Sequence, residues 1–307
     1  MNNSLGEIAA LLTALCWTIT AMAFETAGKR VGALSLNLIR LLIGLVFLAV
    51  YNLIASGQAV PVATPYQWFW LSISGLVGFV LGDLFLFRSF ILVGARVAMV
   101  IMSLVPPITA LIGWIILGER LNWMEILGMT VTLAGILMVM FSKMERGKAT
   151  VHKAQRLGPL LTGGLLALGG AVGQAVGLVL SKKGMAGTEG MEDMNAFSAS
   201  QIRIMVGVAG FAVVLTVFKR WKRFLGAFRD RRAMGTMTLG SFTGPFLGVS
   251  LSLMAVKYTE TGVAATLMAL TPVMLIPADF LIRKERIRIM EIIGILVSVG
   301  GVALFFI

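Results

Sequence analysis

A few charged residues stand inside otherwise apolar runs of this chain, where they could pair or bind a ligand. Asp83 lies well inside the third run. A charge in the centre of a membrane span costs about 2.5 to 3.5 kcal/mol, so Asp83 should face other helices and have a partner. We expect a helix-end ion pair with Arg88 or Arg96. The alternative is a site for a proton or a substrate amine.

Other polar and aromatic residues of these runs admit two interpretations each. Arg40 and Arg203 lie about two turns inside the second and seventh runs, where arginines commonly extend to the interface. We expect structural residues that can pair with an acid, the alternative being ligands of a substrate carboxylate. Gln174 either bonds to a neighbouring helix or faces a cavity. Trp17, in the middle of the first run, either packs or lines a cavity wall.

Residue types for other chemistry are sparse. His152 is the single histidine, and Cys16, inside the first run, is the single cysteine. Neither a histidine-based metal site nor a disulfide framework is therefore expected. The chain also lacks the Gly-x4-Gly-Lys-Ser/Thr loop of nucleotide-driven proteins. We predict no catalytic residue, no metal and no cofactor.

Prolines interrupt two runs at equivalent places. Pro106 lies in the middle of the fourth run, and Pro272 lies in the middle of the ninth. A proline within a helix frees the carbonyl four residues before it, here those of Met102 and Met268. Such carbonyls need a side chain, a water or a ligand as partner, so the interruptions either line a cavity or only kink the helices. The predicted cavity residues are Trp17, Asp83, Met102, Ser103, Pro106, Gln174, Met268, Thr271 and Pro272.

The prolines belong to a long internal repeat. The repeat offset is the separation of Pro106 from Pro272 along the chain. At this offset and without a gap, the chain matches itself at Ala98/Ala264, Met102/Met268, Leu104/Leu270, Glu119/Glu285, Arg120/Arg286, Gly128/Gly294 and Gly135/Gly301. In the same register, Ser74-x3-Gly78-x3-Gly82 becomes Gly240-x3-Gly244-x3-Gly248. Small residues four apart let a neighbouring backbone come close. The chain is a duplication.

Composition places the duplication in a membrane. Hydrophobic residues make up 58% of the chain, charged residues 13%, and mean hydropathy is +0.93. The net charge of +12 comes from short segments between apolar runs, which is typical of membrane topology rather than of nucleic-acid binding. We interpret the basic segment 219–232 in this way, as a topology determinant in contact with anionic lipid.

The apolar runs predict an all-α polytopic membrane protein with ten transmembrane helices. The predicted spans are 5–24, 33–54, 67–88, 96–117, 122–142, 158–181, 198–218, 234–256, 262–282 and 287–307. The longest polar linker divides them into a first five-helix repeat, 1–142, a linker, 143–157, and a second repeat, 158–307. Because each half has an odd number of spans, the two repeats are inverted, an arrangement common in secondary transporters.

The basic residues predict an orientation. Twenty of the 26 fall on the face opposite both termini, four fall on the termini's face, and Arg40 and Arg203 lie within spans. The positive-inside rule therefore puts both termini outside the cell.

Three features together resemble a known family. An arginine stands early in the second span of each half (Leu38-Ile39-Arg40-Leu41 and Gln201-Ile202-Arg203), each fourth span carries a proline, and the first of these ends in Gly118-Glu119-Arg120. The second ends in Lys284-Glu285-Arg286, without the glycine. This whole-chain pattern resembles the drug/metabolite transporter superfamily, EamA-like branch. The resemblance implies a ten-helix carrier in the inner (cytoplasmic) membrane. It also implies both termini in the cytoplasm, against the charge count.

The resemblance leads to a functional hypothesis. We expect a secondary transporter that exports small organic metabolites, such as amino acids or amphipathic compounds, by alternating access. The alternatives are a membrane-embedded enzyme, disfavoured by the lack of clustered acids or histidines, and a non-transporting receptor or scaffold. Expected partners are a small-molecule substrate and the lipid bilayer, without nucleic acid; a proton as coupling ion, and a monomer or a homodimer, stay open. Glu119 and Glu285 are expected to fix turns, Glu119 beside Arg120.

Overall fold

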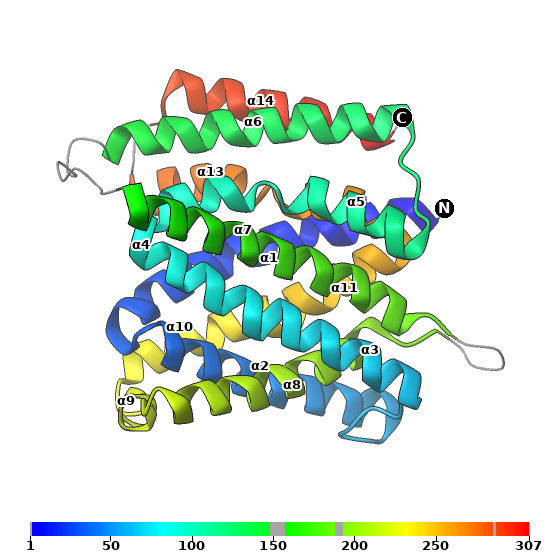
Figure 1. Cartoon of the computed structure of the whole chain (residues 1–307), viewed down its shortest axis with the longest axis vertical. Helices are drawn as coiled ribbons and strands as arrows, with labels where there is room; N and C mark the ends of the chain where they lie inside the picture. Colours follow the sequence, from blue (N-terminus) through cyan, green and yellow to red (C-terminus); the bar gives the residue numbers. More distant parts are fainter. Residues whose placement is uncertain (1, 148–156, 188–192, 285–286, 307) are drawn as a thin grey trace.

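The structure is a computed structural model that describes residues 2–147, 157–187, 193–284 and 287–306. Within these ranges all regular structure is helical (Figure 1). Ten segments are long and apolar enough to cross a membrane, which confirms the ten predicted spans. The first half contains α1 (Asn2–Val31), α2 (Ala33–Ser56), α3 (Pro65–Gly75), η1 (Leu76–Gly82), α4 (Asp83–Met102), α5 (Val105–Leu117) and α6 (Trp123–Gly147).

The second half repeats this order with two additional short elements and with two helices in place of α4. It contains α7 (Leu157–Met185), α8 (Ala196–Val217), α9 (Trp221–Ala227), α10 (Arg231–Ser241), η3 (Phe242–Gly248), α11 (Val249–Tyr258), α12 (Thr261–Met268), α13 (Thr271–Arg283), α14 (Ile289–Ala303) and η4 (Leu304–Phe306). The additional elements are α9 and η4, and α11 and α12 take the place of α4. Both termini lie at one end of the bundle, and α9 lies at the other (Figure 1).

The third span is longer than predicted. It extends from Pro65 to Gly94, so that Arg88 lies within a helix rather than in a loop. Gly94 then turns the chain into the fourth span with φ 80° and ψ 153°, a conformation that is essentially restricted to glycine.

The third and eighth spans each contain a π-helical segment at the same position of the repeat. These segments are η1 and η3, which have seven residues each and are separated by the repeat offset. The small residues predicted to admit a neighbour do so here. A Cβ added at Gly177 of α7 would lie 2.9 Å from the Cα of Gly78, and one at Gly173 would lie 3.0 Å from the Cα of Gly82. Side chains at these positions would push α7 away from the third span.

The fourth and ninth spans are each broken into two helices. The breaks lie at 103–104, between α4 and α5, and at 269–270, between α12 and α13. Pro106 and Pro272 are each the second residue of the following helix. An amide there has no partner within the helix, so the missing N–H costs no hydrogen bond. The carbonyl of Met268 accepts a hydrogen bond from Thr271 Oγ1 at 3.0 Å.

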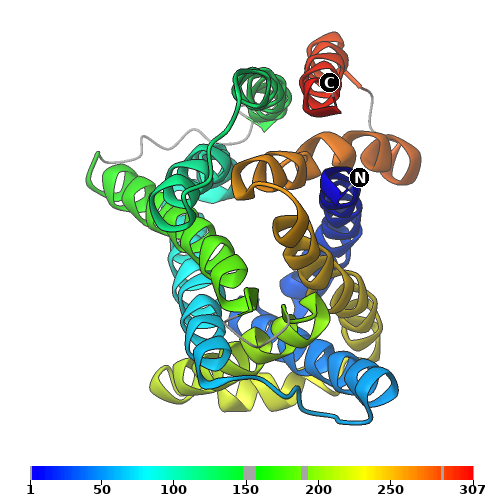
Figure 2. The same cartoon turned by 90° about the vertical axis from the view of Figure 1, so that its right-hand side faces the viewer.

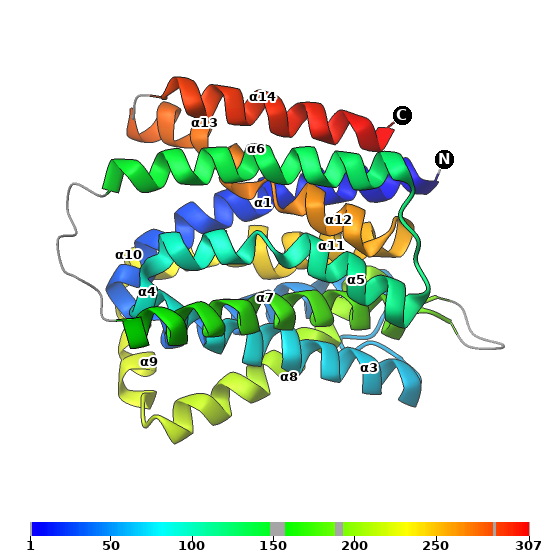
Figure 3. The same ribbon diagram turned by 45° about the horizontal axis from the view of Figure 1, so that its top comes forward.

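The last span of each half shows the inversion directly. α6 and α14 lie side by side and run in opposite directions (Figures 1 and 3). A Cβ at Gly128 would lie 3.0 Å from the carbonyl oxygen of Gly301, and one at Gly135 would lie 2.6 Å from that of Gly294. Because Gly294 and Gly301 are the repeat counterparts of Gly128 and Gly135, these contacts are reciprocal, as a twofold axis requires. The inverted duplication is confirmed.

Candidate functional site

A cavity of about 430 Å³ lies between the two repeats. Figure 2, which views the molecule from the end of both termini, shows helices of both halves around the centre, with α6 and α14 paired to one side. The volume lies within the range of sites for small organic ligands. Eight of the nine predicted cavity residues line it: Trp17, Asp83, Met102, Ser103, Gln174, Met268, Thr271 and Pro272. Pro106 is buried in α5 and is not part of the wall.

Both helix breaks face this cavity. Met102, Ser103 and Val105 line it from the first half. Their counterparts at the repeat offset, which are Met268, Ala269 and Thr271, line it from the second half. At the helix breaks the cavity wall is therefore built from equivalent positions of the two inverted repeats.

A buried ion pair forms one part of the wall. Arg40 Nη2 of α2 donates to Asp83 Oδ2 of α4. The two side chains are 20% and 8% exposed, respectively. Gln174 Nε2 of the second half donates to Asp83 Oδ1 at 3.5 Å, at the long limit of a hydrogen bond. Asp83 thus pairs with Arg40 and not with Arg88, one of its two expected partners; the side chain of Arg96, the other, lies outside the description. A helix-end position favoured neighbours in sequence, whereas in the fold the Arg40 side chain of α2 reaches the carboxylate.

Arg203 of α8 forms another part of the wall and has no carboxylate partner among the described residues. Only 5% of the residue is exposed. Its guanidinium carbon lies 4.8 Å from the ring centroid of Phe79, and its Nε has no hydrogen-bond partner. Gly75 lets α3 approach, because a Cβ there would lie 2.5 Å from the Arg203 carbonyl oxygen. With Arg40 and Asp83 opposite in charge, Arg203 leaves the wall with a formal charge of +1.

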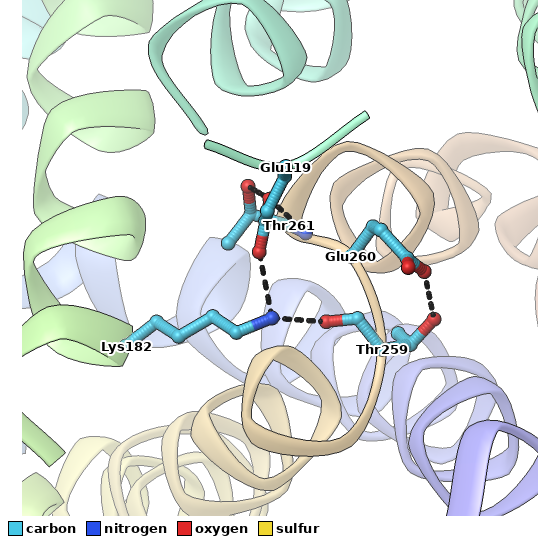
Figure 4. A network of polar contacts seen from close by, with 5 residues as sticks. All are labelled: Glu119, Lys182, Thr259, Glu260 and Thr261. Carbon is cyan, nitrogen blue, oxygen red and sulfur yellow. Dashed lines mark hydrogen bonds and ion pairs between the residues drawn. The ribbon is translucent and has the colours of Figure 1, made fainter. Parts of the chain in front are cut away.

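A polar network closes the bundle at the end that carries both termini (Figure 4). Glu119 Oε1 accepts from Lys182 Nζ at 2.6 Å, and Glu119 Oε2 accepts from the Thr261 amide at 2.9 Å and from Thr261 Oγ1 at 2.5 Å. Lys182 Nζ also donates to the Thr259 carbonyl at 2.8 Å. The network thereby joins the end of α5, the end of α7 and the start of α12. Glu119 was expected to fix a local turn beside Arg120, but its described partners come from distant helices.

The network lies just beyond the cavity. Lys182 is four residues, about one helical turn, after Leu178 of the cavity wall. α5 and α12 pack closely at this end, since a Cβ at Gly262 would lie 2.7 Å from the Cβ of Ala110. No described residue of the network lines the cavity itself. The network is therefore positioned to seal one end of the cavity.

The symmetry-related end is held differently. Lys29, which like Lys182 lies near the end of the first span of its half, pairs with Glu25 of its own helix at 2.7 Å. Glu285, which matches Glu119, lies outside the described residues. α13 makes no contact with the described part of α4 comparable to that of α5 with α12. The two ends of the cavity are therefore not equivalent.

A further ion pair lies at the end opposite the termini. Arg30 Nε donates to Asp230 Oδ2 at 2.6 Å. This hydrogen bond, together with one from the Ala233 amide, holds the pKa of Asp230 below its ordinary value. The pair joins the end of α1 to the start of α10 and lies outside the cavity wall.

Comparison with known proteins shows which family has this arrangement. A model of the EamA-like transporter family matches residues 4–141 and again residues 161–307. The chain belongs to the EamA-like transporter family. It is accordingly a multi-pass membrane protein, and this EamA-like protein transports small molecules. The family's two-repeat architecture agrees with the reciprocal contacts of α6 and α14.

A solved structure supports the same fold. It is titled only "Crystal structure of protein", shares 18% sequence identity, and has a TM-score of 0.75. The alignment covers 99% of this EamA-like chain and 96% of the other. Among curated proteins, none matches the chain. The similarity extends over the whole bundle and says nothing about the solute.

The sequence interpretation missed Lys182 and Thr261. Lys182 entered only the count of basic residues on the termini's face, and Thr261 carried no signal because its amide and hydroxyl act together only once α12 starts beside α5. The repeat could have indicated Lys182, since the first span of each half ends in basic residues, which include Lys29 and Lys182.

Proposed function

We propose that this EamA-like protein is a secondary carrier of small organic metabolites, such as amino acids or amphipathic compounds, and that it works by alternating access. One observation carries the proposal. A cavity at the paired helix breaks is flanked at one end by the network of Glu119, Lys182 and Thr261. Inverted repeats can exchange conformations, which would open such a cavity first to one side and then to the other.

The unequal ends of the cavity support this mechanism. In the described conformation α5 packs against α12, while the equivalent α13 and α4 lack a comparable contact among the described residues. The exchange would release the first contact and form the second. We take residues 1–142 and 158–307 as the two exchanging units, with 143–157 as their linker. Neither unit needs to unfold, because the breaks at 103–104 and 269–270 already divide the moving helices.

The energy source we propose is a gradient of a solute or an ion. The sequence lacks the phosphate-binding loop of nucleotide-driven pumps. A proton is one candidate coupling ion, and Asp83 is its candidate carrier because it is the only acid among the described residues of the cavity wall. Protonation of Asp83 would weaken its pairing with Arg40.

The direction we propose is export across the cytoplasmic (inner) membrane. The basic α9 lies at the end opposite the termini, and the charge bias assigns that end to the cytoplasm. With the network closing the termini's end, the cavity would take up its solute from the cytoplasm. This orientation departs from the cytoplasmic termini that the family resemblance implies.

Transport by the purified protein in liposomes tests the proposal. Vesicles are loaded with a panel of amino acids and amphipathic acids, and release is measured with a proton gradient of either polarity and with no gradient. We expect release of at least one solute above that from protein-free vesicles. Glu119→Gln, which weakens the seal, should change the rate, whereas Arg229→Gln, on an exposed arginine, should not. The proposal fails if no solute of the panel moves under any gradient.

A further inference from the structure

Arg203 is a buried cation without a counter-ion among the described residues. It contacts Phe79 through its guanidinium, and its Nε makes no hydrogen bond. Ionised groups in an apolar interior are normally paired, because an isolated buried charge is strongly disfavoured. An arginine that is only 5% exposed beside a cavity, with donors to spare, needs an anion to complete its environment.

The repeat explains why the protein itself does not supply that anion. Arg40 and Arg203 stand early in the second span of each half, and Arg40 is paired with Asp83. The position that matches Asp83 in the second half, at the repeat offset, is Val249. Val249 also lines the cavity. Among the described residues, each half therefore brings an arginine to the wall, but only the first half brings a carboxylate.

The remaining wall indicates the rest of the ligand. Its polar groups are few, and four methionines line it: Met99 and Met102 of α4, Met140 of α6 and Met268 of α12. Methionine side chains are flexible and adapt to apolar groups of different shape. The wall thus combines one free positive charge with an adaptable apolar surface.

We propose that the cavity binds the carboxylate of a small organic monoanion through Arg203, with the apolar part of the molecule against the methionines. The inference names a substrate class and so rests on the proposed transport function. The guanidinium presents a planar fork of donors that matches a carboxylate. A single negative charge neutralises the wall, whose formal charge is +1 from Arg40, Asp83 and Arg203. A doubly charged phosphate would overcompensate it.

Binding to the purified wild-type protein in lipid nanodiscs tests the proposal without transport. The probes are matched pairs of an acid and its uncharged amide: hexanoate and hexanamide, benzoate and benzamide, and N-acetyl-leucine and N-acetyl-leucinamide. Affinity is obtained from the ligand-dependent rise of the unfolding temperature at pH 7. At least one acid should bind about tenfold or more tightly than its amide, the range for a charge-assisted hydrogen bond.

Variants assign the preference to Arg203. Arg203→Gln should remove the preference for the acid, and Arg203→Lys should retain part of it because the charge remains. Arg229→Gln, on an exposed arginine outside the wall, serves as control and should leave the preference unchanged. If Arg203→Gln does not fold, the proposal is tested by comparing the acid-over-amide preference of Arg203→Lys with that of the wild type. The lysine should reduce this preference measurably.

Two results would overturn the proposal. One is that no acid binds the wild type better than its amide, and the other is that the preference survives unchanged in the folded Arg203 variants. These results differ from failure of the carrier proposal. If acids bind selectively but no solute crosses the vesicle membrane, transport is refuted and the anion site stands. If a neutral or cationic solute is transported and acids show no preference, the anion site is refuted and transport stands.

Discussion

Asp83→Asn tests the polar interior of this bundle quantitatively. In this variant the Arg40 guanidinium would lose the only carboxylate beside it among the described residues. Because the two side chains are 20% and 8% exposed, the loss is that of a buried pair rather than of a surface one. Removing one partner of a buried pair costs about 3 to 5 kcal/mol, since the other charge stays buried without compensation. We expect Asp83→Asn to lower the free energy of unfolding by about this amount.

A double-mutant cycle isolates the pair. The Arg40→Gln, Asp83→Asn double variant removes both charges of the pair, so its loss should fall short of the summed single losses by about 1 to 3 kcal/mol. The free energy of unfolding is measured by denaturant titration of the protein in detergent micelles. Arg88→Gln, on an exposed arginine of α4, is the matched control and should change stability by less than about 0.5 kcal/mol. The assignment is refuted if Asp83→Asn couples to Arg88→Gln and not to Arg40→Gln.

The remaining predictions concern backbone strain, pH and the helix breaks. Gly94→Ala should lower the unfolding temperature, since an alanine at φ 80°, ψ 153° is strained by about 1 to 3 kcal/mol, whereas Gly300→Ala, with no atom near its added Cβ, should not. The hydrogen bond from Arg30 lowers the pKa of Asp230 in the folded protein, so the ionised carboxylate stabilises the fold above the ordinary aspartate pKa. This stabilisation is lost as the pH falls through the lowered pKa. The unfolding temperature should therefore fall less between neutral and acid pH in Asp230→Asn than in the wild type. Pro272→Ala, on the cavity wall, should reduce transport in vesicles by a larger factor than it reduces membrane expression. It should also reduce transport more than Pro106→Ala, whose residue is buried in α5. Equal loss of transport and expression would favour a packing role.

The architecture was predictable because its signals are local or repeated. Each span is a continuous apolar run. Features without a recognised local signature occur in both halves, separated by the repeat offset. The breaks before Val105 and Thr271 follow this offset, as do the π-helical segments that begin at Leu76 and Phe242. The π-helical geometry itself was not predicted, because neither segment has a residue type that distinguishes it from an α-helix.

The pairing of charges was not predictable, because it depends on which helices pack together. Asp83 lies 43 residues from Arg40, and Glu119 lies 63 residues from Lys182. A single sequence indicates that a charge within a span needs a partner, but several basic residues are equally eligible. The choice follows from the tertiary arrangement, in which the Arg40 side chain of α2 reaches Asp83 and α7 packs against α5.

Accessibility of the cavity from the two faces of the membrane tests alternating access most directly. Ser103→Cys places a thiol on the cavity wall in a Cys16→Ser background, which is otherwise free of cysteine. A membrane-impermeant thiol reagent is applied to either face. We predict faster labelling from the face opposite the termini than from the termini's face, and faster labelling from the termini's face when Glu119→Gln weakens the network with Lys182. Equal labelling from both faces with the network intact, or no effect of Glu119→Gln, would contradict the account.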